Sequence, residues 1–178
     1  MRAGARRRAR ADDGAVVVEF ALVLPVVMML LLGMVSGATA WNQSQSLGSG
    51  VRVAGRYAAT LPIPATSVEM ATWLDTIAAR AVSASEGAFG AGVAGRFICV
   101  AFVDPAGPDP DETFSRSTTG AAAPVSGTTP CFDDGQGETS RRVQVVLQRT
   151  GVLDIGFYRQ PLEIRREVVY RYEADSGF

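Results

Sequence analysis

The feature that most constrains this chain is an apolar run from Ala15 to Val35, in which Glu19 is the only charged residue. A helix of that length is about what a hydrocarbon core of roughly 30 Å requires. A secretory signal peptide is the rival interpretation, but its apolar part usually has about 7 to 15 residues and ends at a small-x-small cleavage site. The run is longer and has no clean site of that kind. We therefore expect residues 15–40 to form one retained transmembrane helix.

The charges around the run predict its orientation. Five arginines lie within the first ten residues, and the chain has no lysine, a composition typical of a GC-rich bacterial genome. Basic residues that flank a membrane helix stay on the cytoplasmic side. We therefore expect residues 1–14 to be a cytoplasmic leader at the bacterial cytoplasmic membrane and residues 41–178 to be an extracytoplasmic domain. Trp41, just beyond the run, suits the outer headgroup region.

Glu19 is the unusual residue of the run. A carboxylate deep in a bilayer costs about 2.5 kcal/mol or more, so such acids commonly have a partner and a function. If the chain were cut after Gly14, Ala15 would carry a free amine one helical turn from Glu19. The amine of a neighbouring, axially shifted copy would then neutralise the carboxylate. The alternative is a solvated glutamate near the headgroups, favoured by the helix dipole.

The string from Gly14 to Pro25, GAVVVEFALVLP, carries a resemblance to known proteins. An arginine-rich leader, a glycine, four residues and then Glu19 and Phe20 are similar to the prepilin-peptidase signal of type IV pilin-like proteins. With Pro25 and a leucine-rich run behind it, the string resembles the TadE-like family of tight-adherence (Flp) pilus pseudopilins. The resemblance implies a processing site formed by Gly14, Ala15, Glu19 and Phe20.

That site implies cleavage between Gly14 and Ala15 by a membrane prepilin peptidase, and an assembly or accessory role beside other pilin-like subunits in a surface pilus. Asp12 and Asp13 directly precede the bond, where basic or neutral residues are expected. Behind Gly33, the second acid that the family often carries is replaced by Met34, Val35 and Ser36.

Three further residues of the run bear on how the helix packs. Pro25 removes one backbone donor and its ring clashes with the carbonyl of Ala21, which predicts a kink or local unwinding at that point. Gly33 and Gly37 form a small-xxx-small pair of the kind that lets a second helix approach closely. We expect helix packing through Glu19, Pro25, Gly33 and Gly37.

The helical pattern continues beyond the run. Apolar residues recur every three or four positions at Leu47, Val51, Ala54, Ala58 and Leu61. This period predicts one helix from about Ala15 to Leu61, which Pro62 and Pro64 end. A second helix begins at Thr66, where Glu69 completes a capping-box pattern. Its apolar stripe consists of Met70, Trp73, Leu74, Ile77 and Ala81.

Three segments have the patterns of strands. Residues 96–103 are apolar on both faces and predict a central strand. Residues 141–149 and 164–172 alternate, which predicts half-buried strands with Arg142, Gln144 and Gln148 facing outward. Residues 152–158 form an extra strand or a turn. The predicted fold is α+β: a long pilin-like transmembrane helix, a short second helix and a three- or four-stranded antiparallel sheet on the soluble half of the long helix.

Residues 104–140 are rich in Gly, Pro, Ser, Thr and Asp and predict a long loop. The acids here and at its ends have oxygen ligands that suit calcium, but their spacing matches no known loop, so we interpret them as solvated turn residues and expect no metal site. These acids are Asp104, Asp109, Asp111, Glu112, Asp133 and Asp134. We expect Cys99 and Cys131 to form a disulfide, as an oxidising compartment allows, and two free thiols are the alternative.

Composition excludes several functions. The chain has no histidine and no lysine, so the most frequent general base and several nucleophile arrangements are missing. The glycines at 90, 92 and 95 follow a helix and precede a strand, the wrong context for a dinucleotide site. Scattered arginines form no nucleic-acid patch. We expect no enzyme, cofactor or small-molecule substrate.

Membrane lipid, a prepilin peptidase and other pilin-like subunits, identical or different, are the expected partners. Two function hypotheses remain. One is a processed pseudopilin or minor pilin of a tight-adherence pilus system. The other is an unprocessed, single-pass membrane-anchored protein for surface binding or adhesion. The mass of the mature chain separates them, because only the first loses its leader.

Overall fold

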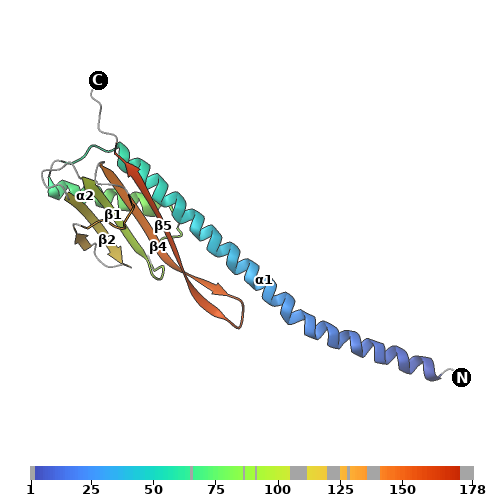
Figure 1. Ribbon diagram of the computed structural model, residues 1–178. Coiled ribbons are helices and arrows are strands. Elements are labelled where there is room, and N and C mark those ends of the chain that lie inside the picture. Colours follow the sequence, from blue (N-terminus) through green and yellow to red (C-terminus); the bar gives the residue numbers. More distant parts are fainter. Residues whose placement is uncertain are drawn as a thin grey trace. The chain divides into compact units, whose positions relative to one another are not determined.

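The computed structural model describes residues 3–64, 66–85, 87–90, 92–104, 112–119, 125–127, 129–135 and 141–172. Within them the predicted α+β fold is confirmed (Figure 1). The elements in chain order are α1 (Ala3–Thr60), α2 (Ser67–Ala84), β1 (Phe97–Asp104), β2 (Glu112–Thr119), β3 (Val125–Gly127), β4 (Arg142–Asp154) and β5 (Arg159–Arg171). The chain divides into two compact units, residues 1–39 with 152–160 and residues 40–151 with 161–178.

Helix α1 differs from its prediction at one end. It ends at Thr60, before Pro62, as expected, but it begins at Ala3 rather than near Ala15. The leader is rich in alanine and arginine, which are good helix formers, so nothing in it stops the helix. Residues 21–25 are helical throughout, so of the predicted kink or local unwinding at Pro25 the unwinding is wrong and the kink stays a prediction. Proline holds a helical φ and the flanking apolar residues continue the helix.

The sheet is larger than predicted. Among the described residues, five strands lie in the order β3-β2-β1-β4-β5, not three or four, and β1 is antiparallel to both β2 and β4. The prediction that residues 104–140 form a long loop is wrong for 112–119 and 125–127, which are β2 and β3. Strand β2 pairs along the whole of β1, from Phe97 opposite Thr119 to Asp104 opposite Glu112. A Ser/Thr-rich strand lacks the apolar alternation by which strands are read.

The core of the second unit lies between the two helices and one face of the sheet. The predicted stripe of α2 is buried there, and Thr66 caps that helix by accepting a hydrogen bond from the Glu69 N–H at 3.3 Å. Trp73 meets Phe102 of β1 edge-on, with ring centroids 5.7 Å apart. The buried core residues of α1 and the strands are Leu47, Val51, Ala54, Ala58, Ile98, Val100, Phe102, Val143, Val145, Leu147 and Ile164.

Two glycines let other elements approach α1 closely. A Cβ atom at Gly50 would lie 2.7 Å from the carbonyl oxygen of Ala81 on α2. A Cβ at Gly55 would overlap the ring of Tyr170 on β5, whereas one at Gly48 would meet nothing within 4 Å. Glycine weakens a helix by about 1 kcal/mol relative to alanine. At positions 50 and 55 that weakness is matched by contacts that a side chain would prevent.

The second face of the sheet is also buried. The register places Cys99, Ala101 and Val103 of β1 opposite Val146, Gln144 and Arg142 of β4. The prediction that Arg142 and Gln144 face outward on a half-buried strand is wrong, since they are 6% and 0% exposed. Alternation of polar and apolar residues indicated a solvated face. A covalently attached segment covers it instead.

Candidate functional site

The segment of α1 from Val16 to Val35 exposes large apolar side chains along its whole length. It contains the stretch that is long and apolar enough to cross a membrane, and none of that stretch is buried by the chain itself. A helix that is apolar all round requires apolar surroundings, which lipid or neighbouring helices provide. Its exposed large apolar residues are Val16, Val17, Val18, Phe20, Leu22, Val23, Leu24, Val26, Val27, Met28, Met29, Leu30, Leu31, Leu32, Met34 and Val35.

The predicted processing residues lie on this uninterrupted helix. Glu19 and Phe20 are exposed, and a Cβ atom at Gly14 would meet nothing within 4 Å. Ala15 and Glu19 are four residues apart, which corresponds to about 6 Å along the helix axis. The bond after Gly14 is therefore held in a helix in the uncut chain, and its recognition by a peptidase stays a prediction.

Of the predicted packing residues, Gly33 and Gly37 have different surroundings. A Cβ at Gly37 would meet nothing within 4 Å, whereas one at Gly33 would lie 3.7 Å from Cγ2 of Ile155. Ile155 belongs to the connection between β4 and β5. The sequence does not predict this contact, because Ile155 is distant from Gly33 in the chain and its segment predicts only a strand or a turn. Gly33 thus faces the chain itself, and Gly37 faces outward.

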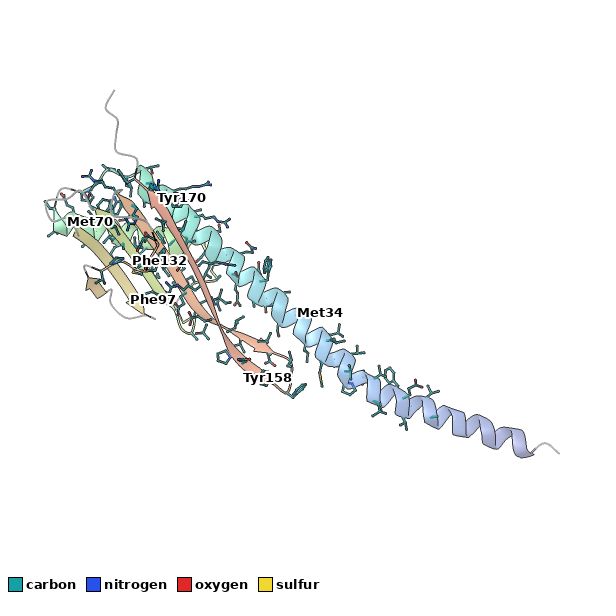
Figure 2. The ribbon with its side chains drawn as sticks, in the orientation of Figure 1. Met34, Met70, Phe97, Phe132, Tyr158 and Tyr170 are labelled. Atoms are coloured by element: carbon teal, nitrogen blue, oxygen red, sulfur yellow. A yellow bond between two sulfur atoms is a disulfide. The ribbon has the colours of Figure 1, made fainter. Side chains whose placement is uncertain are left out.

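The tip of the β4–β5 hairpin, residues 152–158, contacts the last part of the apolar run (Figure 2). The hydroxyl of Ser36 donates to the backbone carbonyl of Asp154, whose N–H donates back to the same hydroxyl at 3.3 Å. A Cβ at Gly156 would lie 3.1 Å from Cδ1 of Leu32. The hairpin tip and α1 are therefore joined by both polar and apolar contacts.

Asp154 shapes the tip as well as joining it to α1. Its carboxylate accepts from the Gly156 N–H at 2.9 Å and from Nε of Arg159 at 2.9 Å. The Gly156 hydrogen bond, followed by that of Arg159, lowers the pKa of Asp154. Gly156 has φ = 93°, a conformation that favours glycine. The Asp-x-Gly spacing of residues 154 and 156 is typical of such turns, although it was not among the predictions made from the sequence.

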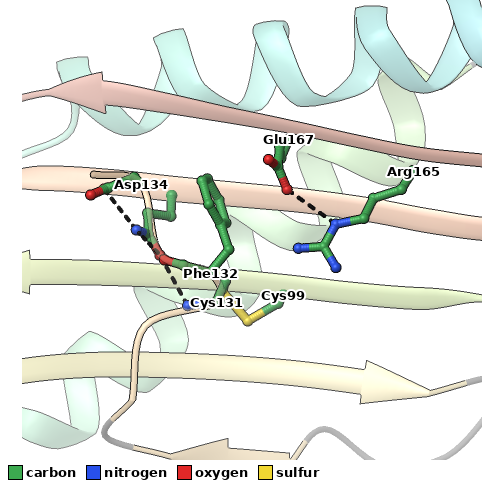
Figure 3. The surroundings of a disulfide bond; sticks show 7 residues. Cys99, Cys131, Phe132, Asp134, Arg165 and Glu167 are labelled. Atoms are coloured by element: carbon green, nitrogen blue, oxygen red, sulfur yellow. Dashed lines mark hydrogen bonds and ion pairs between the residues drawn. A yellow bond between two sulfur atoms is a disulfide. The ribbon is translucent and has the colours of Figure 1, made fainter. Parts of the chain in front are cut away.

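The predicted disulfide is present and anchors residues 129–135, which we call the disulfide strap. Cys99 on β1 and Cys131 are bonded, with Cα atoms 5.7 Å apart. Gln144 binds the strap through its amide: Oε1 accepts from the Cys131 N–H at 2.9 Å and Nε2 donates to the Phe132 carbonyl at 3.0 Å (Figure 3). Nε2 also donates to Asp134 at 2.8 Å. The strap therefore covers the second face of the sheet.

Two of the acids interpreted as solvated are ion-paired instead. Asp134 lies 2.7 Å from Nε of Arg142, with the side chains only 4% and 7% exposed. Asp104 lies 3.0 Å from Nε of Arg141. Asp109 and Asp111 lie outside the described residues. Among the described residues no group of three or more His, Cys, Asp or Glu is placed to hold a metal ion.

Beside the strap is an open hollow of about 530 Å³, lined by Phe132, Arg165, Arg166 and Glu167. Its two arginines are engaged within the chain. Arg165 donates to Glu167 at 3.0 Å, and Arg166 donates to the hydroxyl of Ser44. We assign this hollow no ligand.

These features define a class of protein with one candidate membrane helix that runs without a break into an α+β domain. The family model of the TadE-like proteins matches residues 14–56, and this match confirms the resemblance. The matched range begins at the glycine of the predicted processing site and ends within α1. No curated protein and no solved structure matches the chain.

Proposed function

We propose that the chain is a pseudopilin or minor pilin of a tight-adherence (Flp) pilus assembly and secretion system. In this role a prepilin peptidase removes residues 1–14 and the exposed helix then packs against other pilin-like subunits. The observation that carries the proposal is the match of the TadE-like family model, which begins at Gly14 and includes Glu19 and Phe20. The role is structural, and we expect no catalytic residue.

The exposure of the helix supports subunit packing. Its apolar side chains are surrounded by lipid while the helix spans the membrane, and they need equivalent cover once a subunit enters a filament. Helices of neighbouring subunits supply that cover, because packing in an apolar medium rests on close van der Waals contact. Gly37, which has open space beside it, permits such an approach.

Glu19 provides a polar contact for the same assembly. Cleavage after Gly14 creates an amine on Ala15, and a copy shifted by about one turn brings that amine level with the carboxylate of its neighbour. Charges attract strongly at low dielectric. Removing one partner of a buried pair costs about 3–5 kcal/mol, because the other charge is then buried alone. The Ala15 amine that cleavage creates and the Glu19 carboxylate of a neighbouring copy are therefore the two partners of one contact.

Topology and redox state agree with this role. The arginine-rich leader keeps the N-terminus in the cytoplasm, and the domain that follows lies outside. Disulfides persist in such oxidising compartments and are rare in the cytosol. The bond between Cys99 and Cys131 therefore supports an extracytoplasmic domain.

The intact mass of the membrane-extracted chain tests the proposal. Co-expression with a prepilin peptidase should remove the mass of residues 1–14, and omission of the peptidase should leave it. Gly14→Ala should block the cleavage, whereas Gly37→Ala should not. The two variants are matched, because an added Cβ meets nothing within 4 Å at either glycine.

A chain that keeps Met1 in a peptidase-positive host would contradict processing. That result would favour the alternative function, an unprocessed membrane-anchored protein for surface binding or adhesion. Asp12 and Asp13 make this control necessary, because they place negative charge directly before the bond. Asp12→Ser with Asp13→Ser should therefore speed the cleavage if the peptidase prefers basic or neutral residues there.

A further inference from the structure

We propose that the hairpin tip, residues 152–158, inserts into the outer interface of the bilayer that α1 spans. The exposed apolar side chains of the tip then contact lipid, which gives the chain a second membrane contact besides its helix. This inference rests on the proposed membrane anchoring of α1.

The level of the tip along α1 follows from three contacts. Asp154 is hydrogen-bonded to Ser36, Ile155 lies beside Gly33, and Gly156 lies beside Leu32. The chain thus descends along α1 towards its N-terminus as it enters the turn. At 1.5 Å per residue, Leu32 lies about 4.5 Å inside the end of the apolar run at Val35.

The length of the run fixes where the lipid begins. From Ala15 to Val35 the helix is about 31 Å long, which matches a hydrocarbon core of roughly 30 Å. The outer boundary of the hydrocarbon therefore falls near Val35. Ile155 and Gly156 are level with the last helical turn inside this boundary, so the neighbouring residues of the turn meet the headgroup region.

The side chains of the tip suit that region. Phe157 is 71% exposed, and Val152 and Tyr158 are each 50% exposed. Tyr is enriched at membrane interfaces, where its ring contacts apolar material and its hydroxyl stays wet; the Tyr158 hydroxyl donates to Gln160 at 3.0 Å. Figure 2 shows Tyr158 at the tip, on the stretch beside the part of α1 that carries Met34.

The turn itself does not require these apolar residues. Asp154, Gly156 and Arg159 supply its hydrogen bonds and its ion pair, and none of these interactions involves the ring of Phe157. Arg159 follows Tyr158 and has a mostly exposed side chain. Its guanidinium is held by Asp154, and its aliphatic stem can lie along apolar surface while the charged head stays in the polar layer. Phe157, Tyr158 and Arg159 are apolar, amphipathic and basic in turn, which follows the change from hydrocarbon to polar headgroups across the interface.

Spin labelling of the full chain in phosphatidylcholine/phosphatidylglycerol vesicles tests the inference. Cys99 and Cys131 are bonded to each other, so one added cysteine takes the nitroxide. Phe157→Cys is the test position, Met28→Cys reports the span, and Val68→Cys is an exposed apolar position on α2 that we expect in water. Power saturation compares accessibility to oxygen, which partitions into lipid, with accessibility to a water-soluble nickel complex.

We expect the oxygen-to-nickel ratio at position 157 to be several-fold above that at 68 and below that at 28. A ratio at 157 equal to that at 68, with a lipid reading at 28, would overturn the inference and leave the anchoring intact. An aqueous reading at 28 would overturn the anchoring and, with it, the inference. Protection of 157 from both reagents would also overturn it, because a second copy of the chain would then cover the tip.

Discussion

Gly50 gives the sharpest test of how α1 packs in the second unit. A Cβ atom there would lie 2.7 Å from the Ala81 carbonyl oxygen, 3.0 Å from Cδ1 of Leu147 and 3.2 Å from Cβ of Ser85. The first of these neighbours is backbone, and both Ala81 and Ser85 are completely buried. Relief would therefore require α2 to move away from α1. Overpacking of this kind costs about 1–3 kcal/mol.

Gly48 is the matched control, because it lies half a turn away on the same helix and an added Cβ would meet nothing within 4 Å. Both Gly→Ala changes raise helix propensity by about 1 kcal/mol. That gain is common to the two variants and cancels in their comparison. Gly48→Ala should therefore stabilise the chain by about 1 kcal/mol, and Gly50→Ala should be less stable than Gly48→Ala by about 1–3 kcal/mol.

Urea unfolding of the full-length chain in a mild detergent, followed by near-ultraviolet circular dichroism with the disulfide intact, measures this difference. Equal midpoints for the two variants would refute the close approach of α2 at Gly50. A lower midpoint for Gly50→Ala with an unchanged slope would confirm it, since an unchanged slope means that the same surface is exposed on unfolding.

The remaining predictions concern the strap, the hairpin and the membrane helix. Gln144→Ala should lower the unfolding free energy by about 1–3 kcal/mol, because buried groups of the strap lose their partner, while Gln148→Ala on the same strand should cost less in the same urea assay. Cys131→Ser should cost about 3–4 kcal/mol, and a reductant should then destabilise the parent chain but not the variant. Because the pKa of Asp154 is lowered, its contribution to the turn should be complete above the ordinary value of 3.8 and be lost as the pH falls through the lower folded value. The mobility of a spin label at position 157 should rise as this contribution is lost, and Asp154→Asn should abolish the pH dependence. Glu19→Gln should insert normally but lose co-purification with pilin-like subunits, and unchanged assembly would make Glu19 a solvated helix-entry residue.

Predictions from sequence were correct where a local pattern determines the structure. The end of α1 before Pro62 and the cap at Thr66 each depend on residues within one helical turn. The central strand β1 was identified because both of its faces are apolar, and this pattern does not depend on what covers them. The predicted start of α1 near Ala15 is wrong, because no residue at the predicted processing site or in the described part of the leader ends a helix.

The incorrect predictions concern contacts between distant segments. Gln144 looks solvated because it alternates with apolar residues, and its actual partners lie in a strap held by a bond to Cys99. The only local signal was Cys131 itself, since a disulfide brings its flanking residues onto the strand that carries the other cysteine. The contact of the hairpin tip with Ser36 had no local signal, because it joins residues 118 positions apart.

Glu19 differs from the other acids discussed above in the charged groups that surround it. Asp104, Asp134 and Asp154 each have an arginine partner within the chain. Glu19 is exposed on a helix where residues 11–51 include no basic side chain, so the nearest arginines along the sequence are Arg10 in the leader and Arg52. Loss of the leader would remove Arg10 and create an amine at residue 15. If the proposed cleavage takes place, the positive group nearest to Glu19 along the sequence is that amine, so the proposal couples recognition of this acid to processing through charge.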